Sequence, residues 1–159
     1  MAYVQVPILS TLPGYEGSNP TIVNPQQTDI PTDDMALLEN IFPNGAKPGK
    51  FFEIRYKKEK ILTYVFEFPR QKSRNDLAAL SFVTEKRTNI KNLKMVISEI
   101  LNRMADNNLL TIEILHQNLD NLTESLNKES KLKIGTFVFD VKYFITSQKV
   151  KLDENRRKR

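Results

Sequence analysis

Three consecutive segments between Phe51 and Thr84 constrain the fold of this chain most strongly, because each has the composition of a β-strand. Aromatic and β-branched residues dominate these segments: Phe51–Lys57, Lys60–Phe68 and Leu77–Thr84. A short basic loop, Arg70-Gln-Lys-Ser-Arg-Asn-Asp76, separates the second segment from the third. We therefore expect three successive strands, with a basic loop at the tip of the last hairpin.

Two strands and a helix are predicted before these segments. The alternation in Ala2–Leu9 is typical of a strand, in which Pro7 indicates an edge position or a bulge. Thr21–Val23 forms a short second strand. Thr32 is a favourable N-cap for a helix over Asp33–Phe42, because its hydroxyl accepts from free N–H groups and the helix dipole favours acidic residues in the first turn.

Two amphipathic helices are predicted after the strands. Asn89 caps a helix from Ile90 to Ala105, whose apolar residues follow the three- and four-residue spacing of one buried face. A second helix begins after Asn108, and its apolar residues form one stripe: Ile112, Leu115, Leu119, Leu122 and Leu126. We expect the two helices to cover one face of the sheet.

The segment Leu132–Leu152 fits two periodicities. Alternation typical of a strand is formed by five residues: Phe137, Phe139, Val141, Tyr143 and Ile145. A helical stripe that begins after an N-cap at Asp140 is formed by another five: Val141, Phe144, Ile145, Gln148 and Leu152. We predict a short extended piece followed by a C-terminal helix. The chain then divides into a domain over 1–130, an extension over 131–152 that packs on it and a basic tail over 153–159.

Composition restricts the chemistry of the protein. A chain of 159 residues with no Cys and one His predicts about one domain, without disulfides, thiolate metal sites or a histidine-based metal cluster. No apolar run reaches the roughly 18 residues that span a bilayer. No Lys or Arg precedes Lys47, so the basic start of a secretory signal is missing. We therefore predict a cytoplasmic protein that can also lie peripherally at membranes.

No self-contained active site is visible in the sequence. Gly45-Ala-Lys-Pro-Gly49-Lys50 differs from a phosphate loop in its spacing, and Pro48 removes a backbone donor that such a loop needs. Asp33 and Asp34 are adjacent in a first helical turn, where capping explains them. His116 has no second ligand type near it in the pattern. We therefore predict no metal and no cofactor of the chain's own.

The net charge of +5 is unevenly distributed. Residues 1–46 contain five acidic and no basic residues, so the remainder carries +10. The chain ends in four basic residues: Arg156, Arg157, Lys158 and Arg159. Such a tail fits an anionic membrane surface, nucleic acid or plain solvation. Nucleic acid ranks last, because the basic residues are not interleaved with an exposed aromatic platform.

The basic loop is the one candidate site for chemistry. Arg70, Lys72 and Arg74 lie within five residues of one another. A rigidly presented arginine suits phosphate or carboxylate recognition, and it can also enter a nucleotide site on another protein as an arginine finger. Hairpin loops are also basic for solubility alone, so composition by itself leaves both interpretations open.

The element order β-β-α-β-β-β-α-α resembles the longin domain, a profilin-like layered fold in which a five-stranded antiparallel sheet carries one helix on one face and two on the other. The resemblance covers residues 3–127 and is closest to the N-terminal longin domain of nitrogen permease regulator-like proteins. The best local match is Lys72-Ser-Arg-Asn-Asp-Leu-Ala-Ala-Leu-Ser-Phe-Val83. Gly17-Ser-Asn-Pro-Thr-Ile-Val23 is similar to the family's first hairpin, except that Ser18 and Asn19 separate a Gly and a Pro that are adjacent there.

The resemblance implies a role in GTPase regulation. Its closest family belongs to a complex that activates hydrolysis by Rag-type GTPases, and Arg74 corresponds to the catalytic arginine finger. Arg70, Lys72 and Asn75 would then contact the partner, a small GTPase that brings its own GTP and Mg²⁺. Longin domains also serve as non-catalytic adaptors in membrane trafficking. The alternative that the resemblance implies is therefore an assembly module that pairs with another longin or roadblock-like subunit, or with a second copy.

Overall fold

The computed structural model of the protein describes five ranges of the chain: residues 4–12, 21–24, 47–56, 58–68 and 76–157. The helix predicted over Asp33–Phe42 and the predicted site residues Arg70 to Asn75 lie outside these ranges. The structural statements that follow concern the described residues.

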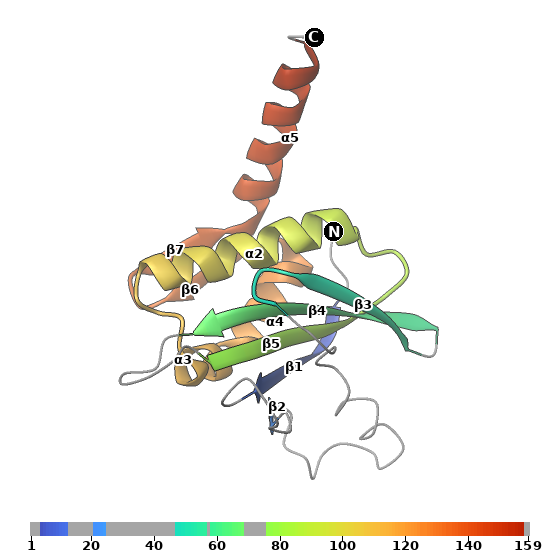
Figure 1. The fold of residues 1–159 in the computed structure, drawn as a ribbon. Helices are drawn as coiled ribbons and strands as arrows, with labels where there is room; N and C mark the ends of the chain where they lie inside the picture. Colours follow the sequence, from blue (N-terminus) through green and yellow to red (C-terminus); the bar gives the residue numbers. More distant parts are fainter. Residues whose placement is uncertain (1–3, 13–20, 25–46, 57, 69–75, 158–159) are drawn as a thin grey trace.

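Strands of the described residues form a five-stranded antiparallel sheet (Figure 1). The strands are β1 (Val4–Leu12), β2 (Thr21–Asn24), β3 (Phe51–Tyr56), β4 (Glu59–Phe68) and β5 (Asp76–Thr84). Their order is β2-β1-β5-β4-β3, so β4 and β5 each pair with a neighbour on both sides. The predicted α+β class and the antiparallel sheet are confirmed.

Pro7 marks an irregularity in β1, as its lack of a backbone N–H predicts. The pairing of β1 with β5 runs from Val4 opposite Thr84 to Leu12 opposite Leu77, and its register shifts between Gln5 and Pro7. The sequence left open an edge position or a bulge. The register shift is that of a bulge or a similar irregularity, and Pro7 also lies outside the residues of β1 that pair with β2, which are Leu9 to Thr11.

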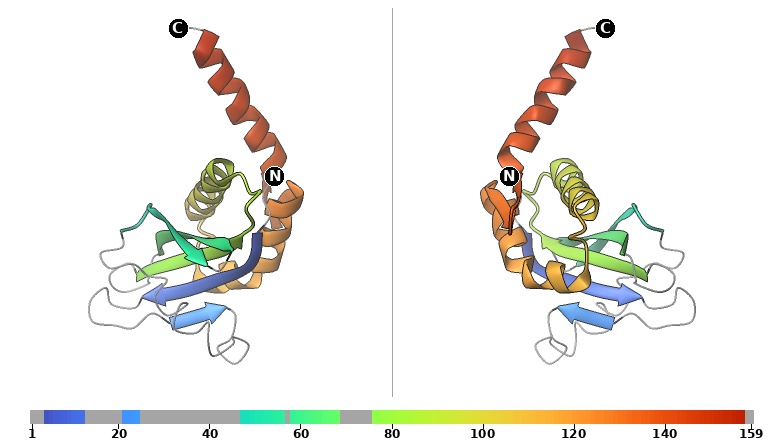
Figure 2. Two further views of the ribbon diagram at one scale, coloured as in Figure 1. Left: turned by 90° about the vertical axis from the view of Figure 1, so that its right-hand side faces the viewer. Right: turned by 90° about the vertical axis from the view of Figure 1, so that its left-hand side faces the viewer.

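Three helices cover one face of the sheet (Figure 2). They are α2 (Ile90–Asp106), α3 (Ile112–Gln117) and α4 (Leu119–Lys128). The sheet contributes side chains that alternate along its strands, among them Leu62, Tyr64 and Phe66 of β4. The predicted stripe of α2 meets them, and six of its residues are buried: Leu93, Val96, Ile97, Ile100, Leu101 and Met104.

The single helix predicted after Asn108 is in fact two helices that meet at Asn118. The backbone of Asn118 departs from the helical region, with φ −111° and ψ 11°. Its side-chain amide donates to the Ile114 carbonyl oxygen at 2.7 Å, and such local side-chain bonds compete with the helical ladder. The predicted apolar stripe continues across the break, since Leu115 and Leu119 are both buried.

The ambiguous segment forms a hairpin and then a helix. The hairpin strands are β6 (Lys131–Ile134) and β7 (Phe137–Asp140), and Gly135 in the turn has the positive φ of 60° that glycine allows at no steric cost. Helix α5 (Val141–Arg157) follows directly. The predicted extended piece and C-terminal helix are therefore confirmed, and five of the residues predicted as a tail continue that helix.

Helix α5 projects away from the body of the protein (Figure 1). Val141 at its start is buried, and Phe144 and Ile145 pack against the core. From Lys149 to Arg157 every residue is exposed. At 1.5 Å per residue the 17 residues of the helix extend about 25 Å.

Asp140 caps α5, as the helical periodicity predicts. The Tyr143 backbone N–H donates to Asp140 Oδ1 at 3.0 Å. We expect Asp140→Ala to lower the free energy of unfolding by about 1 kcal/mol and Asp140→Asn to lower it less, because Asn retains the acceptor oxygen. Urea unfolding followed by helical circular dichroism measures both changes. Equal midpoints for Asp140→Ala and the unmodified protein would show that the cap does not stabilise α5.

Candidate functional site

The strands on either side of the predicted loop pair with each other up to its two ends. The register of β4 and β5 ends with Glu67 opposite Leu77 and Phe68 opposite Asp76. Leu77 is buried and also pairs with Leu12 of β1, whereas the register of β4 with β3 ends at Tyr64. Residues 69–75 therefore leave and rejoin the sheet at two directly paired positions. Arg70, Lys72, Arg74 and Asn75 themselves lie outside the described residues.

Residues 153–157 of the predicted basic tail form the end of helix α5. Arg156 and Arg157 occupy its last turn and are exposed, whereas Lys158 and Arg159 lie outside the described residues. The helix contains five basic residues and two acidic ones, Asp153 and Glu154. Large apolar side chains are also exposed on it: Tyr143, Val150 and Leu152. Helix α5 is thus an isolated basic helix with apolar side chains open to solvent.

The base of α5 is fixed by contacts with α2. The Arg103 guanidinium lies 5.0 Å from the centre of the Phe139 ring and 5.9 Å from that of Phe144, within the range of a cation–π interaction. Glu99 accepts a charge-assisted hydrogen bond from Arg103 Nε at 2.8 Å and holds the guanidinium in place. Arg103 of α2 thus contacts both Phe139 of the hairpin and Phe144 of α5, which joins the start of α5 to α2.

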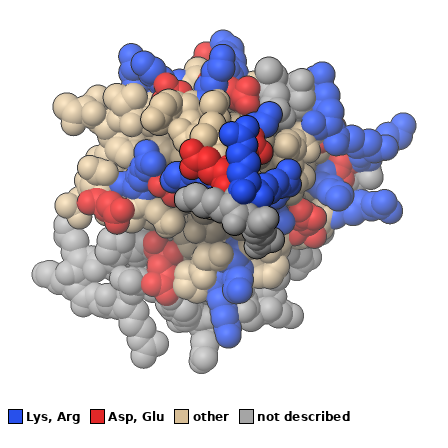
Figure 3. All heavy atoms as spheres, turned by 90° about the horizontal axis from the view of Figure 1, so that it is seen from above, with Lys and Arg blue, Asp and Glu red and all other residues tan. Residues whose placement is uncertain are grey.

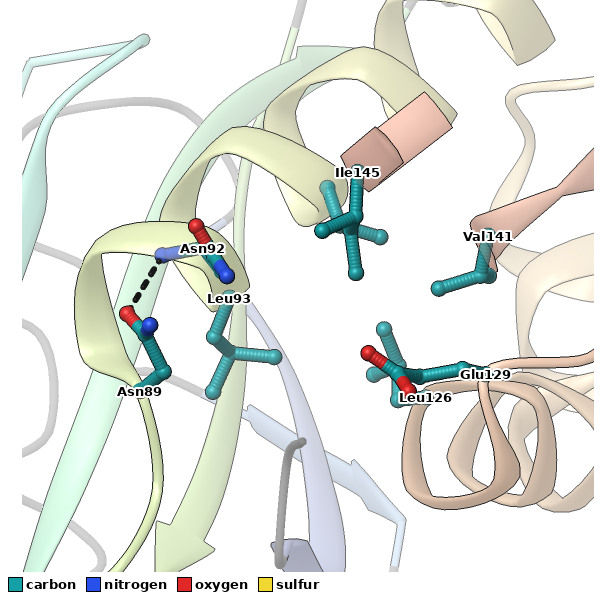
Figure 4. Close-up of a pocket in the computed structure, with 8 residues that line it drawn as sticks. Asn89, Asn92, Leu93, Leu126, Glu129, Val141 and Ile145 are labelled. Carbon is teal, nitrogen blue, oxygen red and sulfur yellow. Dashed lines mark hydrogen bonds between the residues drawn. The ribbon is translucent and has the colours of Figure 1, made fainter. Parts of the chain in front are cut away.

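A narrow gap lies where α2, α4 and α5 meet (Figure 4). Leu93, Leu126, Val141 and Ile145 point toward one another there, and Asn89 accepts a hydrogen bond from the Asn92 backbone N–H at 3.1 Å. Its volume of about 10 Å³ is at the lower limit for a single water molecule. The gap is therefore a packing irregularity at a helix junction and not a ligand site.

A larger cleft lies at the end of β4 and β5 opposite to the Phe68–Asp76 pair. Its volume is about 210 Å³, and four basic residues line it: Arg55, Lys58, Lys60 and Lys86. They come from β3, the β3–β4 turn, β4 and the segment that joins β5 to α2. The sequence pattern singled out none of them, because each stands at an ordinary exposed position and only the strand register brings them together.

The described residues contain no cluster of His, Asp and Glu that could hold a metal ion. Of the helices in the described ranges, none is both long enough and apolar enough to cross a membrane. His116 lies on the last turn of α3 and is exposed. No model of a known protein family matches this sequence, and no curated protein matches it.

Proposed function

We propose that this protein is a longin-like domain that binds a small Ras-superfamily GTPase and stimulates its GTP hydrolysis with Arg74. The observation that carries the proposal is the pairing of Phe68 with Asp76, which brings the two ends of residues 69–75 together on adjacent strands of the sheet. A functional group keeps a more defined geometry when the segment that carries it begins and ends on regular secondary structure, as residues 69–75 do at Phe68 and Asp76.

The architecture also supports the longin-like assignment. The resemblance implies a five-stranded antiparallel sheet followed by two helices on one face. The described sheet has five antiparallel strands, and α2 and the α3–α4 pair pack on the same face of it. The hairpin β6–β7 and helix α5 are additions to that arrangement.

The proposed chemistry divides between the two proteins. The GTPase holds GTP and Mg²⁺, and this chain supplies positive charge where negative charge develops during phosphoryl transfer. Arg74 acts as the finger, Arg70 and Lys72 accelerate association by electrostatic attraction, and Asn75 contacts the GTPase beside them. The chain is then a GTPase-activating protein in trans.

Single-turnover GTP hydrolysis tests this function directly. A panel of small GTPases from the same source is loaded with GTP, and hydrolysis is measured with and without an excess of this protein. We expect at least one GTPase to be accelerated strongly. Binding to the GTP-loaded form, without any acceleration across the panel, would contradict an activating role and favour an adaptor.

The exposed helix α5 favours a second candidate function, that of a non-catalytic assembly module held at an anionic membrane. Each basic residue near such a surface contributes on the order of 1 kcal/mol to the binding free energy, and exposed apolar side chains add to it by insertion into the lipid interface. Strand β3 pairs only with β4 within the described residues, and no described strand occupies its other edge, where another longin or roadblock-like subunit or a second copy would pair.

Vesicle flotation tests the membrane part of this second function. We expect Arg156→Ser/Arg157→Ser to weaken binding to phosphatidylserine vesicles by roughly 30-fold, because two contributions of about 1 kcal/mol are lost. The matched control is Lys131→Ser/Lys133→Ser, which removes the same charge from exposed positions on β6. Equal effects of the two variants would show that net charge matters and α5 does not.

A further inference from the structure

The basic cleft has the features of a site for an anion. Two of its four cations, Arg55 and Lys60, are directly opposite each other in the register of β3 and β4. Lys60 is in turn opposite Thr84 of β5, whose hydroxyl donates to the Lys60 carbonyl oxygen at 3.1 Å. This row of three residues therefore lies near the end of the sheet, one pair before Tyr56 opposite Glu59, and its backbone is held by strand pairing.

The row lies on the face of the sheet that the helices cover. Phe51 and Glu53 precede Arg55 at alternate positions of β3, and both are near α2. The Glu53 carboxylate pairs with Lys94 of α2 at 3.4 Å, and Lys94 also lies 5.9 Å from the centre of the Phe51 ring. On the same face of the sheet, the Arg55–Lys60 pair follows the Glu53–Leu62 pair toward the end of the strands. Arg55 and Lys60 therefore point into the space between the end of the sheet and the start of α2, where Ile90 also lines the cleft.

The charges in the cleft are not balanced. In the part of the chain that the structure describes, no ion pair joins Arg55, Lys58, Lys60 or Lys86 to a carboxylate. Two acidic residues, Glu59 and Glu85, also line the cleft. Arg87 engages the Glu85 carboxylate at 3.0 Å. The four cations therefore exceed the available negative charge.

Two further features increase the positive potential. Arg55 and Lys60 are directly opposite each other across a strand pair, so their two positive charges act on the same space and repel each other. Helix α2 begins beside the cleft and has no acidic residue in its first turn, so nothing on the helix offsets the positive end of its dipole. Figure 3 shows Lys and Arg side chains gathered along its right-hand edge, the side on which the β3–β4 turn and the start of α2 lie in Figure 1.

We propose that this cleft binds clustered phosphate groups, as found in a pyrophosphate or a bisphosphorylated headgroup. A multiply charged anion relieves the repulsion between Arg55 and Lys60, and the Arg55 guanidinium offers it paired donors. The volume of about 210 Å³ is well above that needed for a single water and accommodates such a compact group. The cleft contains Lys60 and Thr84, at the end of the β4–β5 register opposite to the Phe68–Asp76 pair, so its test is independent of the proposed GTPase-activating role.

Calorimetric titration of the whole protein with inorganic pyrophosphate tests the site. We expect binding by the unmodified protein, weakening steeply with salt, and a loss on the order of tenfold for each cation removed in Arg55→Ser/Lys60→Ser. The variant Lys58→Ser/Lys86→Ser provides a second test at the other two cations. The control Lys131→Ser/Lys133→Ser has the same net charge and is expected to bind as the unmodified protein does. No binding, or equal binding by all variants, overturns the proposal.

A second pair of measurements identifies the source of the phosphate. Vesicles with a bisphosphorylated inositol lipid are compared with phosphatidylserine vesicles of equal charge. A preference for the inositol lipid that Arg55→Ser/Lys60→Ser removes supports a lipid headgroup. Pyrophosphate binding without such a preference supports a free phosphate compound. Since removing Arg55 and Lys60 relieves repulsion, the variant is expected to unfold at no lower urea concentration than the unmodified protein, which separates lost binding from lost folding.

Discussion

Replacing Arg74 with alanine is expected to lower the stimulated rate of GTP hydrolysis by about 10³- to 10⁵-fold, the range that a trans-acting arginine contributes. Binding to the GTP-loaded GTPase is expected to change little, because the finger interacts most strongly with charge that develops only during phosphoryl transfer. Single-turnover hydrolysis at saturating protein measures the first effect. Titration of the GTPase with a non-hydrolysable GTP analogue measures the second.

Two further substitutions in the same loop sharpen the test. Arg74→Lys keeps the charge but loses the planar fork of donors, so we expect most of the rate to be lost. Lys72→Ala is the matched control, since it removes a positive charge two residues away. It is expected to slow association in a salt-dependent way and to leave the rate within the complex unchanged. Equal losses of binding and rate in Arg74→Ala would instead assign the arginine to docking.

The elements with strong periodicity were the ones that the sequence predicted well. The apolar residues of β4, β5 and α2 extend over enough positions to distinguish the periodicity of a strand from that of a helix. The cap at Asp140 was also predictable, because an acidic residue before a helical stripe has a specific partner in the free backbone N–H groups. In these places the local chemistry and the final packing agree.

Other features depend on contacts that sequence patterns do not contain. The break at Asn118 leaves the apolar stripe of α3 and α4 uninterrupted, so periodicity alone predicts one helix. The segment after Leu132 fits both periods, and burial of Leu132 and Phe139 against the helices decides in favour of the hairpin. The projection of α5 follows from the absence of a described element to cover its distal half, which its composition does not reveal.

The two candidate sites differ in how far the sequence could reveal them. The basic loop is contiguous, so its cations were visible in one short segment. The cations of the cleft come from separate segments and meet because Arg55 is opposite Lys60 in the strand register. A one-residue shift in that register would place them on opposite faces of the sheet. Such a cluster can therefore be recognised only from the structure.

The last prediction tests whether the C-terminal extension is part of the core. Phe139 is fully buried, its ring centre lies 5.5 Å from that of Phe144, and the Arg103 guanidinium covers it. We expect Phe139→Ala to lower the free energy of unfolding by about 3–5 kcal/mol, because it removes a large buried ring and leaves a cavity between the hairpin, α2 and α5. That is a substantial fraction of the roughly 5–15 kcal/mol typical of a domain.

The matched control lies one residue away on the other face of the same strand. Val138 is 50% exposed, so Val138→Ala is expected to change the free energy of unfolding by no more than about 0.5 kcal/mol. Urea unfolding of both variants, followed by circular dichroism, gives the two values by linear extrapolation. A single transition with a large shift for Phe139→Ala alone means that the hairpin unfolds together with the sheet. Similar small shifts for both would mean that residues 131–157 are an appendage, and α5 would then have no fixed base from which to reach a membrane or a partner.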